Sequence, residues 1–406
     1  MKKLHLSGWL LSGLASAFIG SAAAEEPTLK IGIVGPLTGK SSEDMGQSII
    51  GGARVFVVDM NQMGGVLGRK IELVERDDQG KADVGVALAK ELVEKQKVVA
   101  VVGFGNTGVA IPAAKVFQEA HVPLIVSGAT GATLTKSFLP PAYPVSYIFR
   151  IAASDALQPI VILNDVIDRR KLTKIALLHD ESPYGQFGKQ SMLAELDRRK
   201  IVPVTVASFK VGDEDMTAQL QRAKDSGAQA IVLYCLGPDA ATVLRSAEKL
   251  KLKLPVLGPW GLSQQAFIDR SGASAEGARM AVTFIENELS SVSNQFSLAY
   301  RKINKVNKIP SAVAAAQTYD ALRLLTLAMY QANSAEGPKI VAALENLSQH
   351  TTSTVMSRYY KPFSATDHEA VSLNMIFMGE IHDGKVGFAY KEDASSGSIA
   401  RAKKSQ

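Results

Sequence analysis

Runs of apolar residues alternate with amphipathic segments along most of the chain. Residues 98–103, VVAVVG, form an uninterrupted apolar run, which is typical of a parallel strand covered on both faces. Residues 82–96, ADVGVALAKELVEKQ, place apolar side chains at helical spacing and predict an amphipathic helix. Because strand and helix patterns keep alternating, the sequence predicts β-α-β units, and therefore an α/β fold with a parallel, doubly wound sheet.

The stretch 98–135 is central to this pattern. Its first strand is followed by the Gly-rich turn GNTG (105–108), a helix with Pro112 near its start, a second strand PLIV (123–126), and the turn SGATGAT (127–133). Parallel strands end at the same sheet edge, so we expect the two turns to lie side by side. Ligands bind at this edge in open α/β sheets, and backbone N–H groups there suit a small anion such as a carboxylate.

The alternation begins again near residue 150 and predicts a second βα domain of similar size. The last third of the chain differs from both domains. It contains a strand pattern at 275–286 that could cross back, a long apolar helix at 312–332, and a hairpin that turns at Asp383-Gly384. The chain is therefore expected to form two α/β domains, followed by a last third of mixed helices and strands.

The N-terminus predicts export. Met1-Lys2-Lys3 is basic, residues 9–19 are apolar, and Ala22-Ala23-Ala24 matches a cleavage site. The apolar stretch is too short to span a bilayer, so residues 1–24 are interpreted as a signal peptide and the mature protein as periplasmic.

Composition narrows the range of partners. The chain has 406 residues, of which 46% are hydrophobic and 21% charged, as in ordinary globular proteins. Its net charge is +6, but Lys and Arg are scattered rather than gathered in a basic stripe with interleaved aromatics. We therefore expect no nucleic-acid partner.

Three motifs suggest chemistry that their details do not support. GPLTGKSS (35–42) has too few residues before Gly-Lys for a phosphate-binding P-loop, and no acidic residue follows GFGNTG (103–108) at the end of the next strand to hold a ribose. The six histidines share no metal-ligand spacing, and Cys235 lies in a buried-strand pattern. His179 is the single histidine expected near the sheet edge, and it lacks a nucleophile partner. We expect no cofactor, no metal and no enzymatic activity.

Several motifs, in order and spacing, resemble the branched-chain amino-acid (leucine/isoleucine/valine)-binding family of periplasmic solute-binding proteins. They include IGIVGPLTG, GGVLGRKIELVERDDQ, GNTGVAIPAA, VPLIVSGAT, YIFR, LLHDESPYGQFG, LGPWG, SAEG and TYDAL, and the similarity covers about residues 28–390. The resemblance implies a monomer that captures a small-molecule carboxylate and delivers it to the membrane permease of an ABC importer.

The resemblance also implies the type I periplasmic-binding-protein fold. In this fold, two doubly wound parallel-sheet lobes are joined by a three-crossover hinge and close on the ligand. We expect the first lobe to comprise residues 25–149 and 284–357, the second lobe 150–283 and 358–391, and a polar tail 392–406.

Ligand residues are carried over from the family position by position. The first Gly-rich turn and the Gly-Ala-Thr turn bind the ligand carboxylate in the family, which here implicates Asn106, Thr107, Ser127, Gly128, Ala129 and Thr130. Tyr184, in SPYGQFG, matches the tyrosine with which the second lobe covers the ligand.

Three positions depart from the family. Trp260, in GPWG, replaces the glutamate that neutralises the ligand ammonium, Leu236 replaces an aromatic residue, and Ser41 or Ser42 replaces a tyrosine. An ammonium buried without its carboxylate would cost several kcal/mol, whereas a cation–π contact with tryptophan recovers only about 0.5–2 kcal/mol. We therefore expect an organic carboxylate without an ammonium group, such as an aromatic acid stacked on Trp260.

Two alternatives stay open. Trp260 could be a packing residue while another acid, such as Glu181, serves the ammonium of a branched-chain or other hydrophobic amino acid. The same fold could also serve a periplasmic sensor instead of a transporter.

Overall fold

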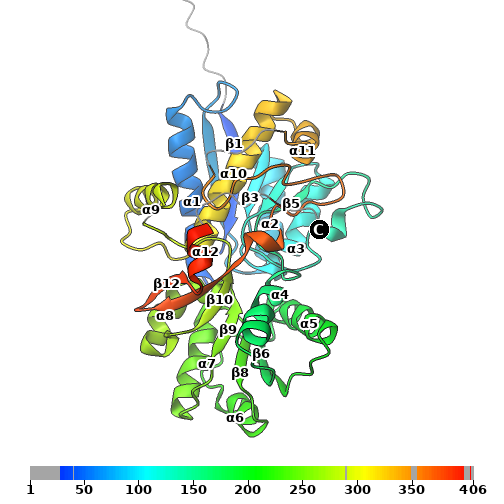
Figure 1. The fold of residues 1–406 in the computed structure, drawn as a ribbon. Coiled ribbons are helices and arrows are strands. Elements are labelled where there is room, and N and C mark those ends of the chain that lie inside the picture. The colour runs from blue at the N-terminus through cyan, green and yellow to red at the C-terminus, as the bar shows by residue number, and fades with distance from the viewer. Residues whose placement is uncertain (1–27, 40, 289, 349–353, 397–402, 404–406) are drawn as a thin grey trace, which may run out of the picture.

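Two β-sheets form the centres of two lobes, which lie end to end in Figure 1. The computed structural model describes residues 28–39, 41–288, 290–348, 354–396 and 403. The predicted signal peptide and most of the predicted polar tail lie outside these residues.

The first lobe is built around five parallel strands. They are β1 (Leu29–Gly35), β2 (Ile71–Asp77), β3 (Ala100–Gly103), β4 (Leu124–Val126) and β5 (Ile148–Arg150), in the sheet order β2-β1-β3-β4-β5. The helices of this lobe are α1 (Glu43–Gln62), α2 (Ala82–Glu91), α3 (Thr107–Glu119), α9 (Ser291–Asn304), α10 (Ala312–Ala332) and α11 (Gly337–Glu345).

The second lobe has a seven-stranded sheet in the order β12-β11-β10-β9-β8-β6-β7. Its strands are β6 (Ile175–Asp180), β7 (Thr205–Phe209), β8 (Ala230–Tyr234), β9 (Val256–Pro259), β10 (Arg279–Val282), β11 (Phe377–His382) and β12 (Lys385–Phe388). Strands β6 to β10 run parallel, and β11 and β12 form the antiparallel hairpin predicted from Asp383-Gly384. The helices are α4 (Gln158–Leu163), α5 (Pro183–Arg198), α6 (Thr217–Asp225), α7 (Gly237–Lys249) and α8 (Gln265–Ser271), with α12 (Lys391–Ser396) after the hairpin.

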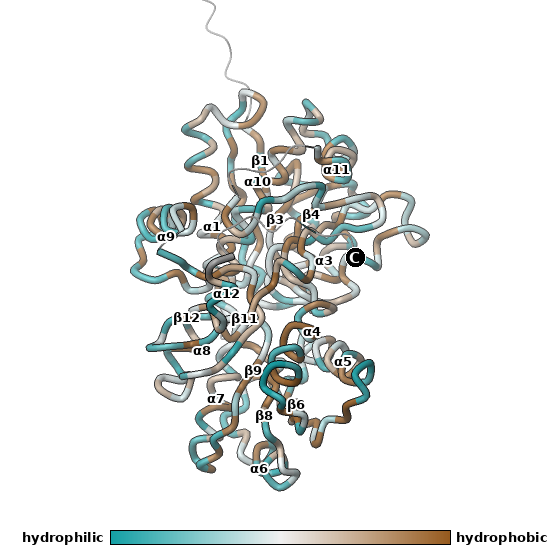
Figure 2. The backbone as a smooth tube through the Cα atoms, in the orientation of Figure 1, coloured by the Kyte–Doolittle hydropathy of each residue, from teal (hydrophilic) through white to brown (hydrophobic). Residues whose placement is uncertain are grey.

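The core follows the predicted strand pattern. Strands β3, β4 and β8 are buried at every residue, and Figure 2 shows hydrophobic colour along the central strands, with polar colour gathered on the outer loops. One hydrophobic cluster extends from Ile33 in lobe 1 through Ile162 to Leu233 in lobe 2. A smaller cluster covers the opposite face of the first sheet, beneath α2 and α3. Each lobe therefore has a packed centre, and apolar contacts continue across the connection.

The chain crosses between the lobes three times: after β5, after β10, and between α11 and β11. This connectivity confirms the predicted type I arrangement. Before the third crossing enters lobe 2, residues 368–370 pair with Arg150 at the end of β5. We therefore propose that lobe 1 extends to about residue 370, beyond the boundary of 357 expected from the sequence.

Two helices near the cleft differ in detail from the prediction. Pro112 occupies the sixth position of α3 rather than its first turn, so no N–H is available there to bond the carbonyl of Gly108. The polar residues that follow the strand pattern in LLHDESPYGQFG suggest a turn, yet the chain is already helical from Pro183, because the side chain of Ser182 caps α5 by accepting from the amide of Gly185 at 3.2 Å.

Arg150 holds the third crossover against lobe 1. Its side chain is fully buried, and its guanidinium pairs with both carboxylate oxygens of Glu369, at 2.7 and 2.8 Å. It also donates to the carbonyl of Gly131 at 2.7 Å, so the same guanidinium supports the second Gly-rich turn.

We predict that Glu369→Gln lowers the free energy of unfolding by about 3 kcal/mol, because it leaves a buried guanidinium without its counter-ion. Urea unfolding measures the change. The control is Glu336→Gln, which removes an exposed partner of Lys339 and should cost no more than about 0.5 kcal/mol. Equal effects of the two substitutions would contradict the structural role given to Arg150.

Candidate ligand-binding site

The two Gly-rich turns of lobe 1 lie in direct contact. A Cβ atom on Gly128 would lie 2.8 Å from the Cα of Gly105, so the turns can approach this closely only without side chains. The amide of Ala129 donates to the carbonyl of Phe104 at 2.9 Å, and the amide of Gly131 donates to Oγ1 of Thr107 at 3.2 Å. The structure therefore places the turns side by side, as the sequence predicted.

The first turn depends on an unusual backbone conformation. Gly103 has φ +136° and Phe104 has φ +61°, and a Cβ at Gly103 would lie 2.1 Å from the carbonyl oxygen of Val34. Helix α3 then begins at Thr107, whose amide has no acceptor among the described residues. The turn thus presents a hydroxyl and the N-terminus of a helix, which together favour a bound anion.

Lobe 2 presents mainly apolar and aromatic side chains to these turns. Tyr184 lies in the first turn of α5, Leu236 immediately precedes α7, and Trp260 follows β9. The indole of Trp260 is 4% exposed, and its backbone amide donates to Oε1 of Gln158 at 3.1 Å. The hydroxyl of Tyr184 has no hydrogen-bond partner in the described part of the chain, and burial raises its pKa well above the usual value, so it stays neutral.

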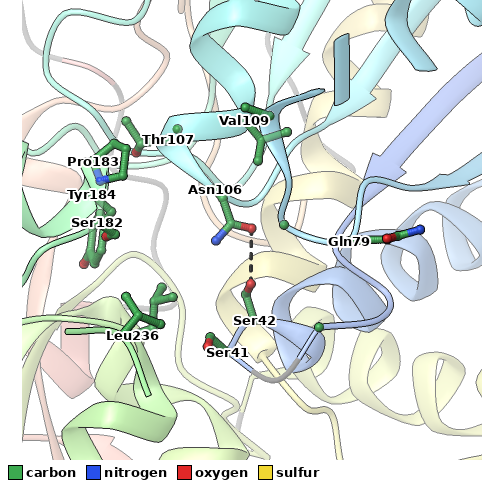
Figure 3. A pocket seen from close by; sticks show the side chains of 15 residues that line it. Ser41, Ser42, Gln79, Asn106, Thr107, Val109, Ser182, Pro183, Tyr184 and Leu236 are labelled. Atoms are coloured by element: carbon green, nitrogen blue, oxygen red, sulfur yellow. Dashed lines mark hydrogen bonds between the residues drawn. The ribbon is translucent and has the colours of Figure 1, made fainter. Parts of the chain in front are cut away.

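Two connected cavities lie between the lobes. The inner one, about 20 Å³, is lined by Met45, Gly105, Asn106, Thr107, Gly128 and Thr130 from lobe 1 and by Tyr184, Cys235, Leu236, Trp260, Gly261 and Gln264 from lobe 2. The outer one, about 320 Å³, shares Asn106, Thr107, Tyr184 and Leu236 with it and adds Ser41, Ser42 and Ser182. Figure 3 shows Ser42 donating to Asn106 (3.2 Å) across from Tyr184 and Leu236. The inner cavity has room for about one water molecule, so a solute as large as an amino acid or benzoate fits there only when the lobes stand further apart than in this structure.

The structure brings most of the predicted residues together. Seven of them line the inner cavity (Asn106, Thr107, Gly128, Thr130, Tyr184, Leu236 and Trp260), and Ser41 and Ser42 line the outer one.

Ser127 and Ala129 are exceptions and line neither cavity. The hydroxyl of Ser127 accepts from Thr318 at 2.8 Å, and Ala129 is buried behind the turn. Gly128 and Thr130 therefore line the inner cavity, whereas Ser127 and Ala129 are buried in the protein interior.

The two other candidate groups of lobe 2 also lie away from the cavities. Glu181 is exposed and accepts from the hydroxyl of Ser208 at 3.1 Å. His179 is buried and bonds the carbonyl of Asp180 through Nδ1 at 2.8 Å.

Sequence reasoning missed five residues of the inner cavity: Met45, Gly105, Cys235, Gly261 and Gln264. Cys235 was assigned to the core, and it is buried there while also bordering the cavity. Gln264 follows the short 3-10 turn Trp260–Ser263, and no pattern in the sequence marks it as a cavity residue.

No ionisable acid or base of the Asp, Glu, Lys, Arg or His type is among the described residues that line the inner cavity. Nor do the described residues include a group of three or more His, Cys, Asp and Glu side chains placed to hold a metal ion. A larger cavity, about 1130 Å³, lies between α8, α9 and the β11–β12 hairpin, and none of the predicted residues lines it.

A buried acid, Asp155, lies behind Thr130 where the chain first crosses between the lobes. It accepts from Oγ1 of Thr130 at 3.0 Å, from the hydroxyl of Tyr234 at 3.3 Å and from Nε2 of Gln158 at 3.2 Å. Burial raises its pKa to about 7, although Arg150 acts in the opposite direction. When Asp155 is ionised, Thr130 donates to it. When Asp155 is protonated, Thr130 is free to donate towards the cleft.

These features define a class of protein: two hinged α/β lobes that enclose a small solute between a polar turn surface and an aromatic one. The family model described as "Periplasmic binding protein" matches residues 28–385, and the chain belongs to this family.

Individual relatives agree with this assignment. The chain is 27% identical to "Leu/Ile/Val-binding protein homolog 3" of Brucella melitensis, over 90% of this chain and 99% of that protein. The branched-chain amino acid transporter substrate binding protein LivJ from Streptococcus pneumoniae, solved with isoleucine, has a TM-score of 0.75 and 26% identity, covering 88% of this chain and 97% of LivJ. A solute binding protein of an ABC transporter from Rhodopseudomonas palustris, solved with 3,4-dihydroxybenzoic acid, has a TM-score of 0.75 and 23% identity, covering 88% and 95%. These similarities agree with the assignment of the chain to the periplasmic binding protein family.

We predict that Asp155 makes stability depend on pH. Its pKa in the folded protein is raised above the unfolded value, so its contribution is fully present below about pH 4 and is lost as the pH rises through about 7. Between pH 4 and pH 8 the free energy of unfolding should therefore fall, relative to that of Asp155→Asn, by about 4 kcal/mol at most.

Urea unfolding across this pH range tests the prediction. Asp197→Asn, at an exposed carboxylate, is the matched control and should keep the wild-type profile. If Asp155→Asn also keeps that profile, then Asp155 does not titrate as its burial implies.

Proposed function

We propose that this protein binds a small organic carboxylate without an ammonium group in the inner cavity, and delivers it to the membrane permease of an ABC importer. The observation that carries the proposal is the charge of the cavity. Lobe 1 offers hydroxyls and a helix N-terminus to an anion, whereas the described lining residues offer no carboxylate to a cation.

We place the carboxylate of the solute at the two Gly-rich turns of lobe 1. Thr107 and Thr130 both line the inner cavity, and the amide of each has no acceptor among the described residues. Amides at the start of a helix bind anions because the helix dipole and the unpaired N–H groups act together. A carboxylate between these two threonines would satisfy both amides.

The body of the solute belongs against lobe 2. Trp260 and Leu236 of lobe 2, together with Met45 of lobe 1, give the inner cavity apolar walls. An aromatic ring gains offset or edge-to-face contacts with an indole in addition to the burial of its area. An ammonium at the same place would lose its hydration, and cation–π attraction would recover only about 0.5–2 kcal/mol.

The solved relatives contain solutes of two chemical classes. The family fold holds an aromatic acid in the Rhodopseudomonas palustris protein and isoleucine in LivJ. A branched-chain or other hydrophobic amino acid is the second candidate, and the sequence similarity to the Leu/Ile/Val-binding homologue favours it. The neutral lining of the inner cavity is the reason for placing the aromatic acid first.

The family supports a proposal for location and partner. A periplasmic binding protein works outside the cytoplasmic membrane, and we propose that residues 1–24 direct this chain there. No helix among the described residues has the length and hydropathy to cross a membrane. We propose that the protein acts as a monomer whose closed form the permease recognises, since the solute favours the conformation in which both lobes contact it.

We predict that benzoate binds the wild-type protein at micromolar affinity and that isoleucine binds about a hundredfold more weakly. Trp260→Glu should reverse this order, because it restores a carboxylate for the ammonium and removes the aromatic surface. Isothermal titration calorimetry measures both ligands on both proteins.

Val202→Glu is the control for this experiment, since it adds the same charge at a side chain that is 84% exposed. It should keep the wild-type order of affinities. Micromolar binding of isoleucine to the wild type, with no binding of benzoate, would overturn the proposal in favour of an amino-acid carrier.

A further inference from the structure

Gln264 carries a buried amide group that the protein itself leaves unpaired. The residue is 2% exposed and lines the inner cavity, and its side chain has no hydrogen-bond partner among the described residues. Each of the three other buried glutamines bonds a described residue, although Gln317 does so only through Nε2, which donates to Thr283 at 3.2 Å, and leaves its Oε1 unpaired. Gln118 donates to the carbonyl of Val145 at 2.7 Å and accepts from the amide of Tyr147 at 2.8 Å, and Gln158 likewise uses both ends of its amide.

The backbone around Gln264 is firmly held, so the unpaired amide is not the result of a loose segment. The carbonyl of Gln264 accepts the first amides of α8, from Phe267 and Ile268. The next residues are tied to lobe 1, because the amide of Gln265 donates to the carbonyl of Pro310 at 2.8 Å and the amide of Ala266 donates to Asp44 at 2.6 Å. The side chain is therefore presented to the cavity from a fixed base.

The surroundings leave room for this amide. A Cβ atom on Gly237 would lie 3.0 Å from Oε1 of Gln264, so a larger residue there would crowd the carboxamide. Tyr184 lines the same cavity, and its hydroxyl also lacks a protein partner among the described residues. A polar group that faces a closed cleft loses free energy when a solute displaces water from it and offers no bond in return, so the half-buried Tyr184 and the buried Gln264 both favour a solute with a polar group at this place.

We propose that Gln264, together with Tyr184, binds an uncharged polar substituent, above all a hydroxyl, on the part of the solute that faces away from its carboxylate. A carboxamide both donates and accepts hydrogen bonds, as a hydroxyl does, whereas it cannot neutralise a charge. Since the carboxylate belongs at the turns of lobe 1 and Gln264 belongs to lobe 2, the two groups would hold opposite parts of one solute. This inference rests on the proposed function and narrows it to hydroxylated carboxylates.

The test uses three probes of similar shape: benzoate, 3,4-dihydroxybenzoate and 3,4-dimethylbenzoate. Calorimetry on the wild type should show that the dihydroxy acid binds at least about tenfold more tightly than the dimethyl acid, because a buried polar site rejects an analogue that cannot pair with it. Gln264→Leu should remove most of this preference, which is measured as the ratio of the two affinities on the same protein.

Gln265→Leu is the matched control, since its side chain lines neither the inner nor the outer cavity and bonds Asp269 instead. It should keep the full preference. If Gln264→Leu does not fold, as judged by circular dichroism, Gln264→Asn serves in its place, because it keeps the amide but withdraws it from the solute and should also weaken the preference.

The possible failures are distinguishable. If none of the three acids binds the wild type, the proposed function is wrong. If benzoate binds but the wild type does not prefer the dihydroxy acid, or the preference persists in Gln264→Leu, the role of Gln264 is wrong and the proposed function stands. Loss of all three acids in a folded Gln264→Leu would show that the residue shapes the cavity instead of selecting the hydroxyl.

Discussion

The close approach of Gly105 and Gly128 is the constraint on which the binding surface depends. With a Cβ on Gly128 only 2.8 Å from the neighbouring Cα, any side chain there would force the two turns apart. Their contact lets the amide of Gly131 reach Thr107, and it places Thr107 and Thr130 beside one cavity. Arg150 stabilises the same surface. Its guanidinium donates to the carbonyl of Gly131 in the second turn and to the carboxylate of Glu369 at the third crossover.

The cleft combines a polar surface from one lobe with a mainly apolar surface from the other. Asp155 connects them, because it accepts from Thr130 of lobe 1 and from Tyr234 of lobe 2. Trp260 is linked to the same group through Gln158. A change in the protonation of Asp155 or in the position of Thr130 would therefore alter hydrogen bonds in both lobes.

Much of the fold could be predicted because its signals are local. The apolar run at 98–103 and the turns that follow two adjacent strands were sufficient to place the sheet edge and most of the carboxylate surface. The direction of single side chains was harder to predict, since Ser127 points towards Thr318 and away from the cleft. Gln264 was missed because its importance lies in an unpaired amide, which depends on tertiary neighbours such as Gly237 and not on any pattern along the chain. The lobe boundary that we propose near residue 370 rests on a similar feature, because the pairing of Arg150 with Glu369 joins residues far apart in sequence.

The central claim is that the turns of lobe 1 hold the carboxylate of the solute. A crystal structure of the complex with benzoate tests it most directly, through the distances from the carboxylate oxygens to Oγ1 of Thr107 and to the amide of Thr130. The account predicts that both lie at hydrogen-bond distance, about 2.7–3.2 Å. A carboxylate bound at the helix N-termini of lobe 2, or a solute in the cavity between α8, α9 and the β11–β12 hairpin, would contradict it.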